Sequence, residues 1–319
     1  MKPGPDKFNP LHFLHPRYWF TWLGLGLLRL IVLLPYGGQL CIGALIGKII
    51  KTFAPRRRRI ATTNIALCFP ELDSKAQGEL LQRNFAAVGI ALIESAMSWW
   101  ESDEQIQRLH RFEGGEHLQQ ALQQGKGVLL LGGHYTTLEI SGRLLASHTH
   151  DLHPIYKPAR NRLFNAMMEN ARNRLFDNLL LNTDFRGIIR SLRNNKLVWY
   201  APDQDFGADQ IVFAPFMNIP AVTLTMTARL AKISGAPVLP FYSQRMPGTQ
   251  GYLIKVLPPL ENFPSGDDVA DATQVNATIE RQVRAAPEQY LWLHRRFKTR
   301  PPGELDFYAN KGINPPRGS

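Results

Sequence analysis

Apolar positions follow two different spacings along the chain. Between residues 74 and 100 a stripe that is apolar except at Ser95 recurs every three or four residues, at Leu81, Phe85, Val88, Leu92, Ser95 and Trp99. This spacing puts them on one face of a helix, so the pattern predicts a single long amphipathic helix that packs against a core. A plausible N-cap residue, Ser74, begins this segment.

The second half of the chain alternates between short apolar runs and helical patterns. Four apolar runs predict buried strands, at residues 128–131, 152–156, 197–201 and 237–242. Helical spacings predict helices at about 136–147, 161–175, 185–195, 222–235 and 270–286. This alternation predicts an α/β fold with a mainly parallel central sheet flanked by helices.

The N-terminal part is more apolar than the rest. Residues 19–50 are nearly all apolar, but Arg29, Pro35 and a glycine pair interrupt them. The uninterrupted piece is shorter than the roughly 20 residues that cross a bilayer as a helix. We expect residues 1–52 to be an apolar membrane-anchoring segment that spans, tilts or lies in the interface. A buried core helix is the alternative. Residues 53–305 then form the main domain, followed by a loosely ordered tail at 306–319.

Charge points to anionic partners. The formal net charge is +11, and basic runs lie at residues 56–59 and 295–300. A net positive charge of this size favours binding to anionic lipid, phosphorylated substrates, an acidic protein or nucleic acid, and the charge alone does not distinguish these partners. Either run can equally be a solvated face. The two cysteines are far apart, which argues against a disulfide framework and fits a reducing compartment.

The stretch "GGHYTTLE" carries the best candidate chemistry. It directly follows the predicted strand 128–131, and ligands of open α/β sheets collect at the carboxyl ends of strands. His134 and Glu139 are five residues apart, so they can meet only if His134 lies in the turn before the helix. A histidine held by a carboxylate can act as a general base. The alternative is a capping box from Thr136 to Glu139, which makes Glu139 structural.

Two further polar clusters follow predicted strands. "YKPARN" offers Lys157, whose cation can hold a phosphate or a developing oxyanion, or can simply be solvated. "APDQDFG" offers Asp203 and Asp205, a D-x-D pattern that also occurs in metal-dependent glycosyltransferases. Turn chemistry explains the same aspartates without a ligand. We expect Asp203 to be structural or to orient substrate.

Several stretches resemble one family in order and spacing. "GGHYTTLEI" looks like the H-x-x-x-x-D/E motif of the lysophospholipid acyltransferase superfamily, in the glutamate form of the late acyltransferases of lipid A biosynthesis. "NIALCFPEL", "LVWYAPDQDFG", "SGAPVLPF" and "APEQYLWLHRRFKTRPPGE" extend the likeness over most of the chain. The last stretch is closest to the lauroyl-transferring branch.

The resemblance implies a reaction and its participants. A fatty acyl chain, lauroyl in this branch, passes from acyl-acyl carrier protein to a hydroxyl on an acyl chain of a Kdo-bearing lipid A precursor, (Kdo)2-lipid IVA. His134 is the implied general base and Glu139 its orienting partner. The family usually has arginine at position 157, so Lys157 lacks the bidentate fork.

The sequence also predicts substrate-binding residues, partners and a location in the cell. The expected substrate-binding residues are Lys157, Asn161, Asp203, Arg295 and Arg296. We expect no metal and no other cofactor, contact with anionic membrane lipid, no nucleic acid, and a bacterial inner-membrane location with the catalytic domain facing the cytoplasm. A lysophospholipid or other glycolipid acyltransferase and a non-catalytic basic membrane adaptor are the alternatives.

Overall fold

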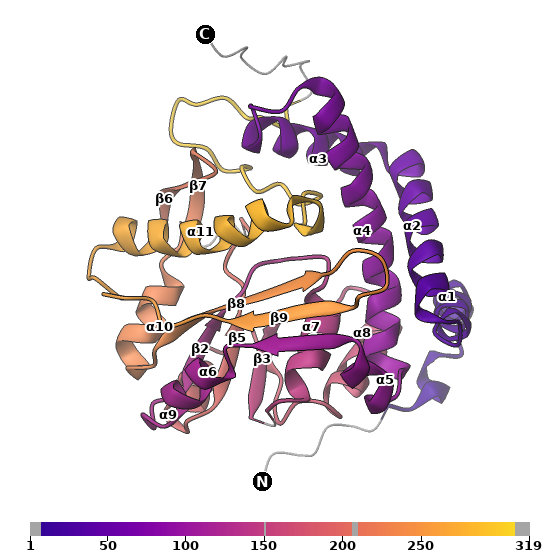
Figure 1. Ribbon diagram of the computed structural model, residues 1–319, viewed down its shortest axis with the longest axis horizontal. Helices are drawn as coiled ribbons and strands as arrows, with labels where there is room; N and C mark the ends of the chain where they lie inside the picture. Colours follow the sequence, from indigo (N-terminus) through magenta and orange to yellow (C-terminus); the bar gives the residue numbers. More distant parts are fainter. Residues whose placement is uncertain (1–7, 150, 206–209, 310–319) are drawn as a thin grey trace.

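The computed structural model describes residues 8–149, 151–205 and 210–309, and a mixed seven-stranded sheet forms its centre (Figure 1). Its strand order is β1-β9-β8-β2-β5-β3-β4, and every neighbouring pair is parallel except β8 and β9. The strands of this sheet are β1 (His110–Glu113), β2 (Val128–Leu131), β3 (Leu152–Tyr156), β4 (Leu180–Leu181), β5 (Leu197–Tyr200), β8 (Val238–Arg245) and β9 (Tyr252–Val256). A separate antiparallel hairpin joins β6 (Ile211–Phe216) to β7 (Ile219–Leu224).

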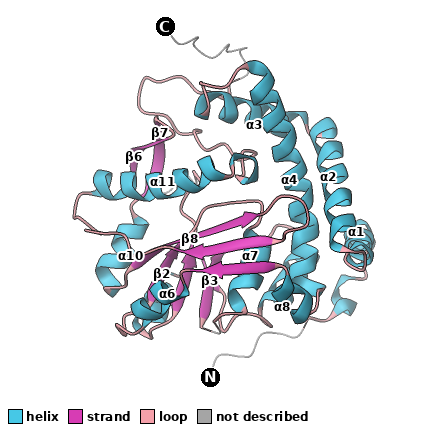
Figure 2. Ribbon diagram, in the orientation of Figure 1, coloured by secondary structure: helices cyan, strands magenta, loops and turns pink. Residues whose placement is uncertain are grey.

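Helices cover both faces of the sheet (Figure 2). They are α1 (Trp19–Ile31), α2 (Tyr36–Phe53), α3 (Pro55–Cys68), α4 (Ser74–Trp100), α5 (Asp103–Arg108), α6 (Gly115–Leu122), α7 (Leu138–Ala146), α8 (Arg162–Arg172), α9 (Phe185–Arg193), α10 (Met226–Ser234) and α11 (Asp268–Ala285). Short 3-10 turns lie at Pro10–Phe13, Pro16–Tyr18 and Pro287–Gln289. All four residues of β2 are buried, as expected for a central strand covered on both sides.

Alternation along β2 sends successive side chains into two different cores. Leu129 and Leu131 pack in the same cluster as the apolar residues of α9, α10 and α11. Leu130 packs on the other face with the apolar residues of α6 and α7. The sheet is therefore the middle layer of the molecule, and the predicted fold class is confirmed for it.

Most predicted elements are confirmed, but one predicted N-cap and one predicted helix start are wrong. The helix predicted at 74–100 is α4, which Asp73 caps rather than Ser74, because the Asp73 carboxylate accepts from the Ala76 N–H. The predicted strands correspond to β2, β3, β5 and β8. The helix predicted from 222 begins only at Met226, because residues 219–224 pair with β6 as a strand.

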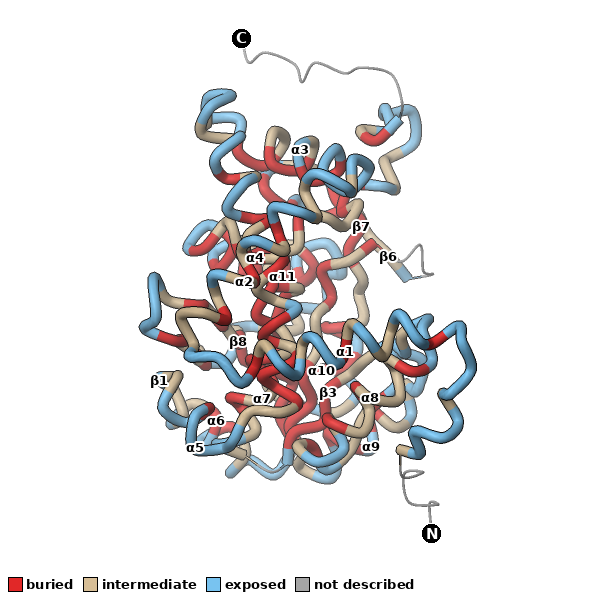
Figure 3. Tube along the Cα trace, turned by 90° about the vertical axis from the view of Figure 1, so that its right-hand side faces the viewer, coloured by how far each residue is buried: buried red, intermediate tan, exposed pale blue. Residues whose placement is uncertain are grey.

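The N-terminal apolar segment folds as two helices rather than one anchor. Pro35 lies between α1 and α2, and α2 packs along α4. The expected membrane-crossing helix is not supported, since none of the described helices has both the length and the apolar content to cross a bilayer. In Figure 3 much of α1 is exposed, and its outer side carries Trp19, Phe20, Leu23, Leu27 and Leu30.

The segment after α11 is held tightly against the rest of the molecule. The buried amides of Asn84 and Asn64 donate to backbone carbonyls in this segment, Asn84 to Tyr290 and Asn64 to Trp292. Of the predicted tail, residues 306–309 are described, and Tyr308 among them is buried and donates to Asn64. Residues 310–319 lie outside the described residues.

Candidate active site

His134 lies in the loop between β2 and α7, outside the helix that follows it. The loop can run close to its neighbours because two glycines precede the histidine. A Cβ at Gly132 would come within 2.7 Å of the indole nitrogen of Trp199. The segment after α11 fixes the loop from the other side, since the Leu291 N–H donates to the His134 carbonyl at 3.0 Å. The predicted position of His134 before the helix is confirmed.

Asp203, from the loop after β5, is the direct partner of His134. The distance from its Oδ1 to Nδ1 of His134 is 2.6 Å, and its Oδ2 accepts from the His134 backbone N–H at 2.9 Å. β2 and β5 are neighbouring parallel strands, so their carboxyl ends bring the two loops together. In the neutral imidazole this contact puts the proton on Nδ1, which leaves Nε2 as the proton acceptor.

The environment of Asp203 keeps its carboxylate ionised. Burial alone would raise its pKa, but the charge of His134 and two hydrogen bonds from that residue lower the pKa to about 2. The Tyr290 hydroxyl lowers the pKa of this carboxylate further. Burial raises the pKa of the Tyr290 hydroxyl, which therefore stays protonated as a donor. Asp203 is thus a fixed negative charge behind the imidazole.

Glu139 has other partners, which corrects its predicted pairing with His134. Its Oε1 accepts from Nε of Arg172 at 3.0 Å and from the indole N–H of Trp99 at 3.1 Å, and Arg172 also donates to Oε2. The side chains of Glu139 and Arg172 are both mostly buried. The predicted capping box is wrong for the same reason, because the Glu139 carboxylate points toward α8. The N-cap of α7 is Thr137, and its side chain makes no capping hydrogen bond. A catalytic role for Glu139 stays a prediction.

A second histidine, His294, lies next to the His134–Asp203 pair. Both histidines line a small cavity with Asn64, Asp203 and Tyr290. Burial lowers the pKa of His294 to about 4, so its imidazole is neutral at ordinary pH. Sequence reasoning missed His294, Tyr290, Arg172 and Trp99. His294 and Tyr290 stand within the matching stretch "APEQYLWLHRRFKTRPPGE", whereas no local signal distinguishes Arg172 among the arginines of α8.

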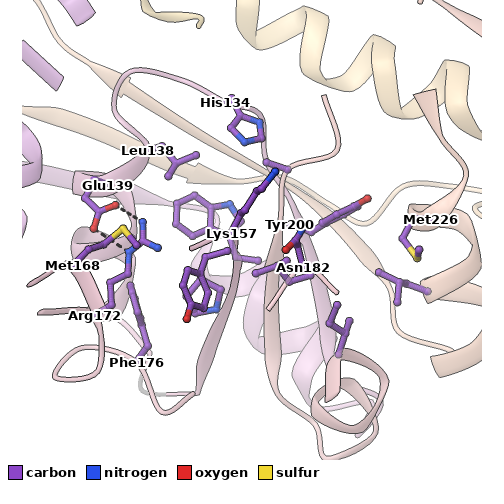
Figure 4. Close-up of a pocket in the computed structure, with 18 of the residues that line it drawn as sticks. His134, Leu138, Glu139, Lys157, Met168, Arg172, Phe176, Asn182, Tyr200 and Met226 are labelled. Atoms are coloured by element: carbon purple, nitrogen blue, oxygen red, sulfur yellow. Dashed lines mark hydrogen bonds and ion pairs between the residues drawn. The ribbon is translucent and has the colours of Figure 1, made fainter. Parts of the chain in front are cut away.

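An apolar pocket of about 440 Å³ opens beside His134. Leu138, Gly142, Met168, Phe176 and Trp199 line it, together with residues of α9 and α10. Figure 4 shows His134 at one side of this pocket, the Glu139–Arg172 pair and Met168 toward one end, and Met226 toward the other. Lys157 extends into the middle, close to Tyr200 and Asn182 in the same view.

The remaining predicted binding residues lie outside this pocket. Asn161 caps α8 by accepting from the Phe164 N–H, and its amide donates to Thr21 of α1. Arg295 stacks over the ring of Tyr308. Arg296 is buried, donates to the Val222 carbonyl at 2.5 Å and holds the β6–β7 hairpin. These contacts favour structural roles for the three side chains, and their part in substrate binding stays a prediction.

The D-x-D aspartates do not converge on a common point. Asp203 faces His134, whereas Asp205 accepts from the backbone N–H of Thr299 at 2.8 Å and from its hydroxyl. Within the described part of the chain, no group of three or more histidine, cysteine or acidic side chains could hold a metal ion. The geometry does not support the metal-dependent glycosyltransferase alternative.

Comparison with known proteins identifies relatives over nearly the whole chain. Residues 7–299 match the family described as bacterial lipid A biosynthesis acyltransferase. The lipid A biosynthesis lauroyltransferase of Escherichia coli strain K12 is 40% identical over 91% of this chain and 95% of that protein. The palmitoleoyltransferase of the same strain is 38% identical over 93% of this chain and 96% of its own length. The lipid A biosynthesis myristoyltransferase of the same strain is 30% identical over 95% of this chain and 94% of its own length.

Proposed function

Because the chain belongs to the bacterial lipid A biosynthesis acyltransferase family, we propose a specific reaction for it. A fatty acyl chain, lauroyl as the first candidate, passes from the thioester of acyl-acyl carrier protein to a hydroxyl on an acyl chain of (Kdo)2-lipid IVA. The observation that carries this proposal is the pair of His134 and the buried Asp203 at the wall of an apolar pocket. Such a pocket suits a hydrocarbon chain, and such a pair suits proton removal from a hydroxyl.

His134 acts as general base in this mechanism. Its Nε2 takes the proton of the acceptor hydroxyl while the oxygen attacks the thioester carbonyl. The tetrahedral intermediate then expels the thiolate, which takes the proton back from the imidazolium. Asp203 holds the ring in the required tautomer and stabilises the imidazolium, which is the role that the sequence assigned to Glu139.

Two cationic side chains, Arg172 and Lys157, line the pocket and belong to the proposed active site. Glu139, which also accepts from the indole N–H of Trp99, holds the guanidinium of Arg172 at the wall, so we assign Glu139 to positioning Arg172. Lys157 reaches the middle of the pocket and stabilises the oxyanion or a substrate phosphate. Neither group needs a metal or a redox cofactor for this chemistry.

The exposed apolar side of α1 is the proposed membrane contact. Phe20 is 88% exposed and Leu23 61%, an unusual exposure for such large apolar side chains. Basic residues at 56–59 begin α3, directly after α2, and suit anionic headgroups. We propose that α1 lies in the interface of the bacterial inner membrane with the sheet domain on the cytoplasmic side.

A transfer assay tests the proposal. Purified protein should move labelled lauroyl from acyl carrier protein to (Kdo)2-lipid IVA. His134→Ala should lower the rate by about 10² to 10⁴, since this is the usual value of general-base assistance. His148→Ala is the matched control, because His148 is exposed and contacts His110 instead of the pocket.

Other outcomes select the alternatives. Transfer to a lysophospholipid in place of the lipid A precursor would indicate a different acceptor. Lipid binding without any transfer, in wild type and variant alike, would support the adaptor. Donors of different chain length in competition identify the preferred acyl group.

A further inference from the structure

The outer surface of α9 and α10 is strongly cationic. α9 has Arg186, Arg190 and Arg193, and α10 has Arg229 and Lys232, whereas neither helix contains a carboxylate. All five side chains are exposed. The spacings of three and four residues put the three arginines of α9 on one face, opposite the buried Ile188, Ile189 and Leu192. We name these five residues the α9–α10 basic face.

The basic face is largely unneutralised. Arg186, Arg190 and Arg193 form no ion pair with any carboxylate in the described ranges. Arginine side chains kept together without partners repel one another, so an acidic surface would relieve that repulsion when it binds. Burial of the opposite helix sides explains why α9 and α10 fold here, but it does not require cations on their outer sides.

The same helices form one end of the acyl pocket. Phe185 and Ile188 of α9 line it, as do Met226 and Leu230 of α10. Arg229 links the two features, since its guanidinium lies 5.0 Å from the ring centre of Phe185 and donates to Gln210, another pocket residue. A macromolecule on the basic face would thus sit beside the part of the acyl pocket that α9 and α10 line.

The opposite end of the pocket lies toward the apolar side of the molecule. Met168 of α8 lines that end and packs in one cluster with Tyr18 and Leu25 of the α1 region. Figure 1 shows α1 and the pair α9 and α10 on different sides of the sheet domain. A lipid acceptor that arrives along α1 and a water-soluble donor that arrives at α9 and α10 would not block each other.

We propose that the α9–α10 basic face is the docking surface for the acidic carrier protein that delivers the acyl thioester. This inference rests on the proposed acyl transfer and adds where the donor binds. Charge on a docking surface acts mainly on the association rate and its salt dependence. The face should therefore affect kcat/KM for the carrier-bound donor and have little effect on a small donor.

The test compares two donors with one pair of variants. Arg186→Glu/Arg190→Glu should lower kcat/KM for lauroyl-acyl carrier protein by at least about tenfold at low salt, because steering changes association rates by 10 to 10³. With S-lauroyl-pantetheine, which lacks the protein, the same variant should match wild type. Lys75→Glu/Arg83→Glu makes an equal charge change on the exposed N-terminal half of α4, which contributes nothing to the pocket, and should keep both activities.

Each contrary result has a separate meaning. An equal loss with both donors, or no loss with the carrier-bound donor, would overturn the docking surface while the acyl transfer stands. Wild type that transfers from neither donor would instead overturn the proposed function. If the variant loses flotation with vesicles of phosphatidylglycerol and phosphatidylethanolamine but keeps its carrier kinetics, the face binds anionic lipid and the inference is wrong.

Discussion

The carboxylate of Asp203 determines what the imidazole of His134 can do. Asp203→Asn keeps the size of the side chain but removes the charge that favours the imidazolium. It also turns the amide NH2, a donor, toward one of two other donors, either the ring Nδ1–H or the His134 backbone N–H. We expect the transfer rate to fall by about 10² to 10⁴, within the range of general-base catalysis, as measured in single-turnover assays.

Asp205→Asn is the control for this substitution. Asp205 is buried in the same loop region but accepts from Thr299, so its loss should affect stability more than the transfer rate. Circular dichroism and thermal melts of both variants separate the two effects. Asp203→Asn with nearly unchanged kinetics would contradict the assigned role.

His294 should make the stability of the protein depend on pH. Burial lowers its folded pKa to about 4, and the unfolded value is near 6.5. The unfolded chain therefore binds more protons between these values, so stability is complete above about pH 6.5 and falls toward pH 4. One such proton gives a slope of at most about 1.4 kcal/mol per pH unit.

His294→Gln should remove this dependence, and urea unfolding at pH 7, 5.5 and 4.5 measures it. The difference in unfolding free energy between wild type and variant should shrink or reverse as the pH falls. A parallel dependence in both proteins would show that His294 is not the titrating group. His12→Gln, at an exposed histidine near the N-terminus, is the matched control.

Part of this site was predictable from residue patterns alone. Gly-Gly-His after a buried strand predicted the loop position of His134. The pairing with Asp203 was not predicted, because it depends on β2 and β5 being neighbours in the sheet. These strands are far apart in the sequence, and residue patterns alone do not show that they pair. The predicted pairing of Glu139 with His134 is wrong because the Glu139 carboxylate instead accepts hydrogen bonds from Arg172 of α8.

At the scale of elements, the packing of α2 on α4 depends on three glycines. A Cβ at Gly89 of α4 would lie 2.1 Å from the carbonyl oxygen of Gly43 and 2.2 Å from the nitrogen of Gly47, both in α2. Gly89→Ala should therefore push the helices apart and destabilise the protein by about 2–3 kcal/mol, the upper range for overpacking. Denaturant unfolding measures the difference.

Gly78→Ala on the same helix provides the control. Nothing lies within 4 Å of a Cβ at Gly78, which is exposed, so alanine there should be neutral or stabilise by about 0.5–1 kcal/mol through helix propensity. Equal effects of the two substitutions would show that close helix packing is not the reason for Gly89.

Hydrophobic periodicity predicted the helices and strands that are buried on one side or completely. It failed where pairing with another strand determines whether a segment is a helix or a strand. α4, β2, β3 and β5 follow their patterns closely. The β6–β7 hairpin was missed because residues 219–224 can read as either spacing, and the contact with β6 and α11 selects the strand. The interruption at Pro35 was visible in the sequence, but the packing of α2 on α4 was not.

At the scale of the whole molecule, the surface is divided by chemistry. The apolar side of α1 and the α9–α10 basic face lie on different sides of the sheet domain, and the pocket extends between α8 and α9. This arrangement suits a reaction between a lipid and a water-soluble donor. Net charge alone predicted anionic partners without showing where each would bind.

The apolar side of α1 gives the last prediction. Phe20 and Leu27 lie on one helix face and are 88% and 52% exposed. Burial of each in a lipid interface contributes about 1.5–3 kcal/mol. Phe20→Glu/Leu27→Glu should thus weaken binding to vesicles by roughly 100-fold or more, measured by flotation, while transfer to detergent-dispersed acceptor persists. Leu305→Glu changes another exposed leucine, 75% exposed, and should bind like wild type. If the double variant also binds like wild type, the basic residues of α3 suffice for membrane association and α1 has another role.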